Sequence, residues 1–243
     1  MNFFDFKIER GDGLGFGLFS RGHIGYLFLC ACLIAGLCLV YRCVGKACRR
    51  RLRLMVAWGA VGFELTRAAL LLFSGEYSVG RLPLHLCTMA VYILLSHALR
   101  GGSLTGQFLF AFCMPGAAAA LFLPDWNYYP LFHFMTLCGF VLHALTVGYV
   151  LMQVSGRDLR PDIHMAPPCL GLMLLLAAPV YVFDLLADTN YMFLNWPPEN
   201  TPLMWFAPLG RLYILGYLPL IAIVWTVLYF PFYRKNGKKA RTD

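Results

Sequence analysis

The sequence predicts an all-α, polytopic membrane protein with seven transmembrane helices in a single domain over residues 1–243. The first observation is composition: 60% of the residues are hydrophobic, 13% are charged, and the mean hydropathy is +0.65. So few charges cannot cover the surface of a water-soluble protein of this size. The second observation is the length of the apolar stretches, and the third is the uneven distribution of Lys and Arg. Together they place the chain in a bilayer.

Seven apolar stretches are long enough, or nearly so, to span hydrocarbon as helices, which takes about 20 residues each. We expect them at residues 24–41, 54–74, 84–99, 104–122, 132–152, 167–186 and 209–230. The third is the shortest, so it begins irregularly at Leu82 and Pro83 or tilts less than its neighbours. Residues 1–23 contain Asp5, Glu9 and many glycines, which predicts an interfacial segment rather than a cleaved signal. Residues 231–243 form a basic tail.

Lys and Arg are concentrated on one side of the predicted membrane. The first link, "RCVGKACRRRLR", holds six, the tail holds five, and that side carries fourteen in all. The other side carries Lys7, Arg10, Arg21, Arg81 and, as a further candidate, Arg211. Because Lys and Arg accumulate in cytoplasmic links, we expect the amino terminus outside and the carboxyl terminus in the cytoplasm, with the chain in the cell membrane. Nucleic acid is not an expected partner, since no basic segment belongs to a soluble module.

Ionisable side chains inside a membrane are costly and mark function by default, and here they gather in the predicted outer half. Glu64 and Arg67 lie three residues apart on the second helix, so they share a face and can form an ion pair. Such a pair either serves function or only packs the helices. We expect a polar pocket open to the outer leaflet, with substrate contacts from Glu64, Arg67, Asp125, Tyr128, Asn190, Tyr191 and His23.

Cys87 and a neighbouring histidine would give this pocket a nucleophile. A cysteine is nucleophilic only as the thiolate, and an imidazole can take its proton while an arginine stabilises the anion. Such a pair permits acyl transfer through a thioester, with His85, Tyr191 or Asn190 as hydrogen-bond donors to the oxyanion.

Five segments resemble the YwaF-like family of bacterial integral membrane proteins: "LFSRGH", "RLPLHLC", "LFLPDWNYYPLFHF", "FVLHALTVGY" and "TNYMFLNWPPENTPL". That family is distantly similar to the vertebrate multi-pass acyltransferase that loads polyunsaturated chains onto ether phospholipids, and to lipid hydrolases of the androgen-induced type. The resemblance implies a nucleophile on one helix and a histidine base on another. It places them at Cys87 and His143.

The histidine partner of Cys87 has two candidates. At 1.5 Å per residue, His143 lies roughly 9 Å deeper than Cys87, whereas His133 is almost level with it. Either the third helix begins deeper than its apolar stretch suggests, or His133 is the base. His143 is the first choice because the resemblance points to it.

These observations predict a membrane-embedded acyltransferase or lipid hydrolase that acts on phospholipid or lipoprotein acyl chains in the outer leaflet. Its partners would be membrane lipids, and we expect no cofactor and no metal, since no short Cys/His spacing predicts zinc. The alternative is a transporter or lipid-binding protein without covalent chemistry, because Pro115, Gly116 and Pro179 interrupt two helices as in transporters. A haem carrier is disfavoured, because paired histidines on the third and fifth helices do not share a face.

Overall fold

The computed structural model describes residues 3–199 and 201–239, and within these ranges it contains helices and no strand. Six helices there are long and apolar enough to cross a membrane, at Arg21–Cys43, Lys46–Phe73, Ser103–Phe122, Phe134–Ser155, Ile163–Ala187 and Pro202–Phe232, and the apolar helix Leu86–Arg100 is shorter. The expectation of an all-α, multi-pass protein is therefore confirmed. The orientation of the termini stays a prediction.

The elements follow one another along the chain with short links. They are α1 (Arg21–Cys43), α2 (Lys46–Phe73), η1 (Val79–Arg81), α3 (Leu86–Arg100), α4 (Ser103–Phe108), η2 (Leu109–Cys113), α5 (Met114–Phe122), α6 (Phe134–Ser155), η3 (Ile163–Met165), α7 (Ala166–Ala187), η4 (Tyr191–Phe193), η5 (Pro202–Gly216) and α8 (Tyr217–Lys239).

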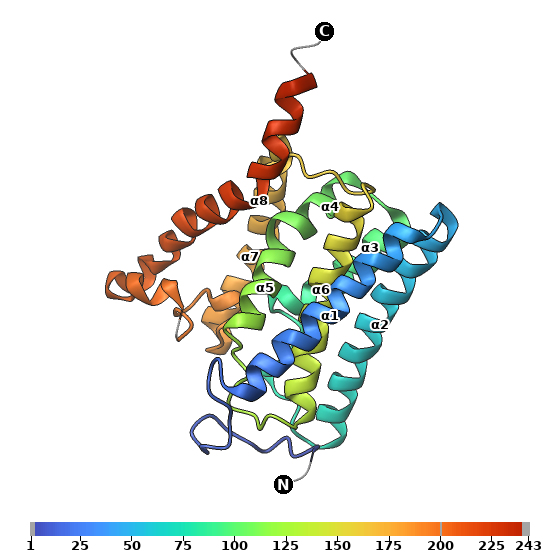
Figure 1. Cartoon of the computed structure of the whole chain (residues 1–243). Coiled ribbons are helices and arrows are strands. Elements are labelled where there is room, and N and C mark those ends of the chain that lie inside the picture. The colour runs from blue at the N-terminus through green and yellow to red at the C-terminus, as the bar shows by residue number, and fades with distance from the viewer. Residues whose placement is uncertain (1–2, 200, 240–243) are drawn as a thin grey trace.

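Helix α6 lies at the centre of the bundle and packs against α1, α2 and α5 (Figure 1). Its apolar residues lie on all sides, which is the pattern of a helix surrounded by protein. Small residues permit close approach: a Cβ added at Gly148 would lie 2.8 Å from a methyl carbon of Leu37 on α1. Small residues are typical of helix contacts in membranes, where packing rather than water exclusion drives association. The central position of α6 brings His143 into the core.

The predicted fourth helix is continuous, although its hydrogen bonding changes in the middle. Residues 109–113 form a π-helical segment between α4 and α5. Pro115 has no N–H to donate to the carbonyl of Ala111, and the indole Nε1 of Trp225 on α8 donates to that oxygen at 3.0 Å. A side chain from a neighbouring helix therefore satisfies the backbone group that the proline frees.

Helix α2 begins eight residues before the apolar stretch that predicted it. The expected first residue was 54, whereas the helix starts at Lys46 and includes most of the basic link. Arg and Lys favour helix strongly, so the helix continues past the residues that would cross hydrocarbon. The predicted seventh stretch is also divided, since Pro202–Gly216 form the 3-10 element η5 and α8 follows it. In Figure 1, η5 stands away from the other helices, whereas α8 packs on the core through residues such as Trp225 and Tyr229.

The amino-terminal segment lies at the end of the bundle opposite the α1–α2 link (Figure 1). Phe6 is buried and packs in one cluster with Leu71, Phe134 and Cys138. Phe16 N–H donates to the carbonyl of Asn127 at 2.9 Å. These contacts fix the segment on the protein, and its interfacial placement stays a prediction. In the predicted basic tail, α8 continues to Lys239, and residues 240–243 lie outside the described residues.

Candidate functional site

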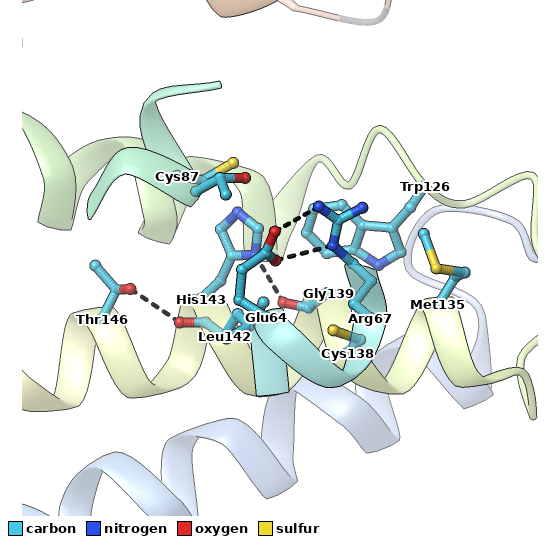
Figure 2. Close-up of a pocket in the computed structure, with 11 residues that line it drawn as sticks. Glu64, Arg67, Cys87, Trp126, Met135, Cys138, Gly139, Leu142, His143 and Thr146 are labelled. Atoms are coloured by element: carbon cyan, nitrogen blue, oxygen red, sulfur yellow. Dashed lines mark hydrogen bonds and ion pairs between the residues drawn. The ribbon is translucent and has the colours of Figure 1, made fainter. Parts of the chain in front are cut away.

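A cavity of about 130 Å³ lies between α2, α3, α6 and the link from α5 to α6. We call it the Cys87 cavity. Its walls are mostly apolar, with a few polar and ionisable groups among them. The lining residues are Glu64, Arg67, Cys87, Thr88, Trp126, Met135, Cys138, Gly139, Leu142, His143 and Thr146 (Figure 2).

Cys87 is the second residue of α3. Pro83 precedes the helix, and His85 has the extended backbone of an N-cap residue, with φ −68° and ψ 145°. The first amides of a helix have no intrahelical acceptor, and their aligned dipoles favour negative charge. Helix amino termini stabilise cysteine thiolates for this reason. The start of α3 at Leu86 therefore places Cys87 beside backbone amides that have no intrahelical acceptor.

His143 on α6 is oriented by its own helix. Its Nδ1 lies 2.6 Å from the carbonyl oxygen of Gly139, one turn earlier. A carbonyl oxygen can only accept, so Nδ1 carries the hydrogen, and in the neutral ring Nε2 keeps a free lone pair. The indole ring of Trp126 stacks on the imidazole with centroids 4.7 Å apart. In Figure 2 the ring lies between Cys87 and Gly139. His143 is thus held with Nδ1 on Gly139 O, and Nε2 is the ring nitrogen left available.

Glu64 and Arg67 form the expected ion pair in the cavity wall. Arg67 donates from Nε to Glu64 at 2.8 Å and from Nη2 at 2.5 Å. The Glu64 side chain is 2% exposed and that of Arg67 is 14% exposed. This two-point contact neutralises a carboxylate and a guanidinium inside the membrane-spanning part of the chain. The pair adds fixed polarity to the cavity without net charge.

His133 does not line the Cys87 cavity, and both of its ring nitrogens are engaged. Nδ1 accepts from Met135 N–H at 3.1 Å and caps α6, while Nε2 donates to the carbonyl of Asp5 at 3.0 Å. Burial lowers the pKa of His133, which agrees with a neutral ring. The ring also stacks on Tyr129. His133 therefore keeps no free lone pair for a proton, whereas His143 shares the cavity with Cys87.

His85, Tyr191 and Asn190 lie outside the lining of the Cys87 cavity, where they hold the chain around α3 and η4. The Tyr191 hydroxyl donates to Val79 O at 2.5 Å and accepts from Leu82 N–H at 2.7 Å. His85 Nδ1 accepts a hydrogen bond from the backbone N–H of Met192 at 3.3 Å. Asn190 donates to a backbone carbonyl six residues later in its own link. These contacts anchor the irregular segment before α3 and so set the depth of Cys87.

Asp125, Tyr128 and His23 also lie apart from the cavity lining. Asp125 pairs with Arg10 at 2.5 Å, and the Arg10 guanidinium lies 5.0 Å from the centre of the Tyr128 ring. Burial raises the pKa of the Tyr128 phenol, and the neighbouring Tyr129 adds to this. His23 Nε2 lies 2.9 Å from the carbonyl of Leu121. Asp125 and Tyr128 fasten the amino-terminal segment to the link from α5 to α6, and His23 fastens α1 to the end of α5. Their contact with substrate stays a prediction.

Several lining residues were not among the sequence candidates, notably Trp126, Thr88, Gly139 and Thr146. Thr88 is adjacent to Cys87, and Thr146 lies three residues after His143 on the same helix face, so spacing alone could have included them. Trp126 lies in the link from α5 to α6, and no local pattern relates it to His143. Its Nε1 is buried and has no hydrogen-bond partner among the described residues. Among all the residues that the structure describes, no three His, Cys, Asp or Glu side chains are grouped as metal ligands would be.

Replacing Gly139 with alanine is expected to destabilise the fold by about 1–3 kcal/mol, the typical cost of overpacking. A Cβ at this position would lie 2.5 Å from the Trp126 ring, which must then move off His143. Gly171→Ala in α7 is the matched control, because a Cβ there meets nothing within 4 Å. Unfolding in detergent would measure both. Equal stability of the two variants would contradict the proposed packing of Trp126 on Gly139.

The chain was also compared with known proteins. The pattern of the TMEM164 family matches residues 18–229, which is most of the chain and includes every residue of the Cys87 cavity. No curated protein and no solved structure matches the chain. The finer resemblances, to the YwaF-like family and to an ether-phospholipid acyltransferase, stay predictions. Because the match spans far more than half of the sequence, the chain belongs to the TMEM164 family, a family of membrane proteins.

Proposed function

We propose that this protein is a membrane-embedded acyltransferase or lipid hydrolase in which Cys87 is the nucleophile and His143 is the base. One observation carries the proposal. His143 donates from Nδ1 to Gly139 O at 2.6 Å, which leaves Nε2 as the acceptor in a cavity that Cys87 also lines. A nucleophile, a base and a third group that orients the base are the parts of an activated cysteine site. Here the orienting group is a backbone carbonyl.

The first chemical step transfers the thiol proton of Cys87 to His143 Nε2. The thiolate attacks the carbonyl carbon of a lipid ester, and the carbonyl oxygen takes the negative charge. Backbone amides at the start of α3 are suitable donors to that oxyanion. The intermediate collapses as the ester C–O bond breaks, and the leaving alkoxide takes the proton from His143. The acyl chain remains on Cys87 as a thioester.

The second step decides between transfer and hydrolysis. His143 removes a proton from an incoming hydroxyl group, and the resulting oxygen attacks the thioester. The C–S bond then breaks, and the departing Cys87 thiolate takes the proton back from His143. A lipid alcohol as acceptor gives an acyltransferase, and water gives a hydrolase. The apolar walls of the cavity favour acyl chains that enter from the bilayer, so phospholipid or lipoprotein acyl chains in the outer leaflet of the cell membrane are the proposed substrates.

The proposal is tested by trapping the thioester. The purified chain in nanodiscs is incubated with a phospholipid that carries an alkyne-tagged acyl chain, and the reaction is quenched in acid. We expect label at Cys87 that neutral hydroxylamine removes, and no label in Cys87→Ala. Cys138→Ala is the matched control, because Cys138 lines the same cavity and is expected to leave labelling intact.

Two outcomes would overturn the proposal. One is full lipid turnover by Cys87→Ala. The other is an absence of label in the wild type together with substrate uptake into proteoliposomes that Cys87→Ala does not affect, which would favour a transporter.

A further inference from the structure

A second cavity, of about 340 Å³, lies at the end of the bundle formed by the α1–α2, α3–α4 and α6–α7 links. We call it the basic-end cavity. It shares no lining residue with the Cys87 cavity. Its walls are mainly polar, and its volume is within the range of sites for small ligands. Among its lining residues are Arg53, His97, Gln107, Gln153, Asp158 and Arg160.

The cavity has an excess of positive charge. Asp158 is the acidic residue in its lining, and it is already paired. Arg49 Nη1 donates to one carboxylate oxygen at 3.2 Å, and the Tyr41 hydroxyl donates to the other at 2.6 Å. Arg49 is not a lining residue, so Asp158 is neutralised from outside, and Arg53 and Arg160 have no acidic partner among the residues described.

Arg53 has a side-chain donor that no described residue accepts from. Its Nε atom is buried and makes no hydrogen bond to any described residue. A buried donor without an acceptor is costly, so such donors normally find one in the protein, in water or in a bound group. An anion in the cavity would supply acceptors for the guanidinium group of Arg53, which lines it. Arginine is suited to this role, because its planar fork matches the oxygens of a phosphate.

The backbone around the cavity is fixed in place. Gln107 donates to Arg160 O at 2.8 Å and accepts from Asp162 N–H at 3.1 Å, which holds the link that bears Arg160. Gly101 and Gly102 have φ values of 71° and 116°, which favour glycine and turn the chain into the helix that begins at Ser103. The free amides of that first turn add further positive potential beside the arginines.

We propose that the basic-end cavity binds a phosphate group, carried by a lipid headgroup or by a free anion. This end holds the links rich in Lys and Arg, where phosphate headgroups of a bilayer would lie. Arg53 and Arg160 have no acidic partner among the described residues, and the backbone around them is fixed, so the cavity should prefer a phosphate to a neutral headgroup. The proposal does not rest on the chemistry proposed for Cys87.

The test titrates the full chain in detergent, by calorimetry, with three probes. They are inorganic phosphate, dioctanoyl phosphatidic acid and dioctanoylglycerol, which lacks the phosphate. We expect Arg53→Gln and Arg160→Gln each to weaken phosphate binding about tenfold or more, since each removes a charged hydrogen bond. Arg50→Gln is the matched control, because Arg50 is exposed on the same helix as Arg53 and does not line the cavity. Cys87→Ala is expected to bind as the wild type does.

The probes separate the two sources of phosphate. Binding of phosphatidic acid alone identifies a headgroup site, and binding of inorganic phosphate with similar affinity identifies a site for free anions. Binding of neither, equal binding of dioctanoylglycerol, or an equal loss in Arg50→Gln would overturn the proposal. If Arg53→Gln does not fold, Arg160→Gln decides alone, because the Arg160 side chain is exposed and its loss is not expected to disturb the core.

Discussion

Replacing His143 with glutamine is expected to lower lipid turnover by about 10²–10⁴-fold, the usual contribution of a positioned general base. The amide cannot take the thiol proton of Cys87, although its size is close to that of imidazole. The double variant with Cys87→Ala should be little worse than either single variant, because a nucleophile and its base act as one unit. Mass spectrometry of phospholipid acyl chains in proteoliposomes measures the rates.

His133→Asn is the matched control for this prediction. Asparagine can still accept from Met135 N–H and cap α6, so the helix start should be preserved. We expect turnover close to that of the wild type. A loss in His133→Asn as large as in His143→Gln would identify His133 as the base and would contradict the assignment of His143.

Replacing Arg67 with methionine is expected to reduce the free energy of unfolding by about 3–5 kcal/mol. The change leaves the Glu64 carboxylate buried without its partner, and Glu64 is 2% exposed. Adding Glu64→Gln in the same chain should recover most of this loss, since the uncompensated charge is then removed. Reversible unfolding in mixed micelles measures the three variants.

The exposed pair of Arg10 and Asp125 provides the comparison. Their side chains are 58% and 46% exposed, and such pairs contribute about 1 kcal/mol or less. Arg10→Met should therefore change stability far less than Arg67→Met does. If the two variants lost equal stability, the Glu64 carboxylate would have to be hydrated, and the Glu64–Arg67 pair would not be the buried contact described.

The number and type of the helices could be predicted from the sequence, but their ends could not. Hydropathy measures which residues can face hydrocarbon, and the apolar stretches accordingly identify the spans. The ends of a helix are set by its backbone hydrogen bonds and caps, and hydropathy does not measure these. Lys46 therefore starts α2 well before its apolar stretch, and the stretch that predicted one last helix covers parts of η5 and α8.

The candidate residues were likewise visible in the sequence, and their grouping was not. Four of them, Glu64, Arg67, Cys87 and His143, line one cavity. The depth estimate separated Cys87 from His143, although the two residues line the same cavity. In the structure, the contacts of Tyr191 with Val79 and Leu82 hold an irregular segment in place, and α3 starts at Leu86.

The sequence by itself determined a multi-pass helical membrane protein, the side on which basic residues gather, and the ion pair of Glu64 and Arg67. These three features depend on composition and on the spacing of residues within one helix, and both can be read from the sequence directly. Only the tertiary structure decided which histidine has a free nitrogen and which residues share a cavity with Cys87. His133 caps α6 and His143 lies within it, and they differ because the ring of His133 contacts Asp5 whereas that of His143 contacts Gly139 and Trp126. Such neighbours come from distant parts of the chain as well as from the same helix, so spacing alone could not predict them.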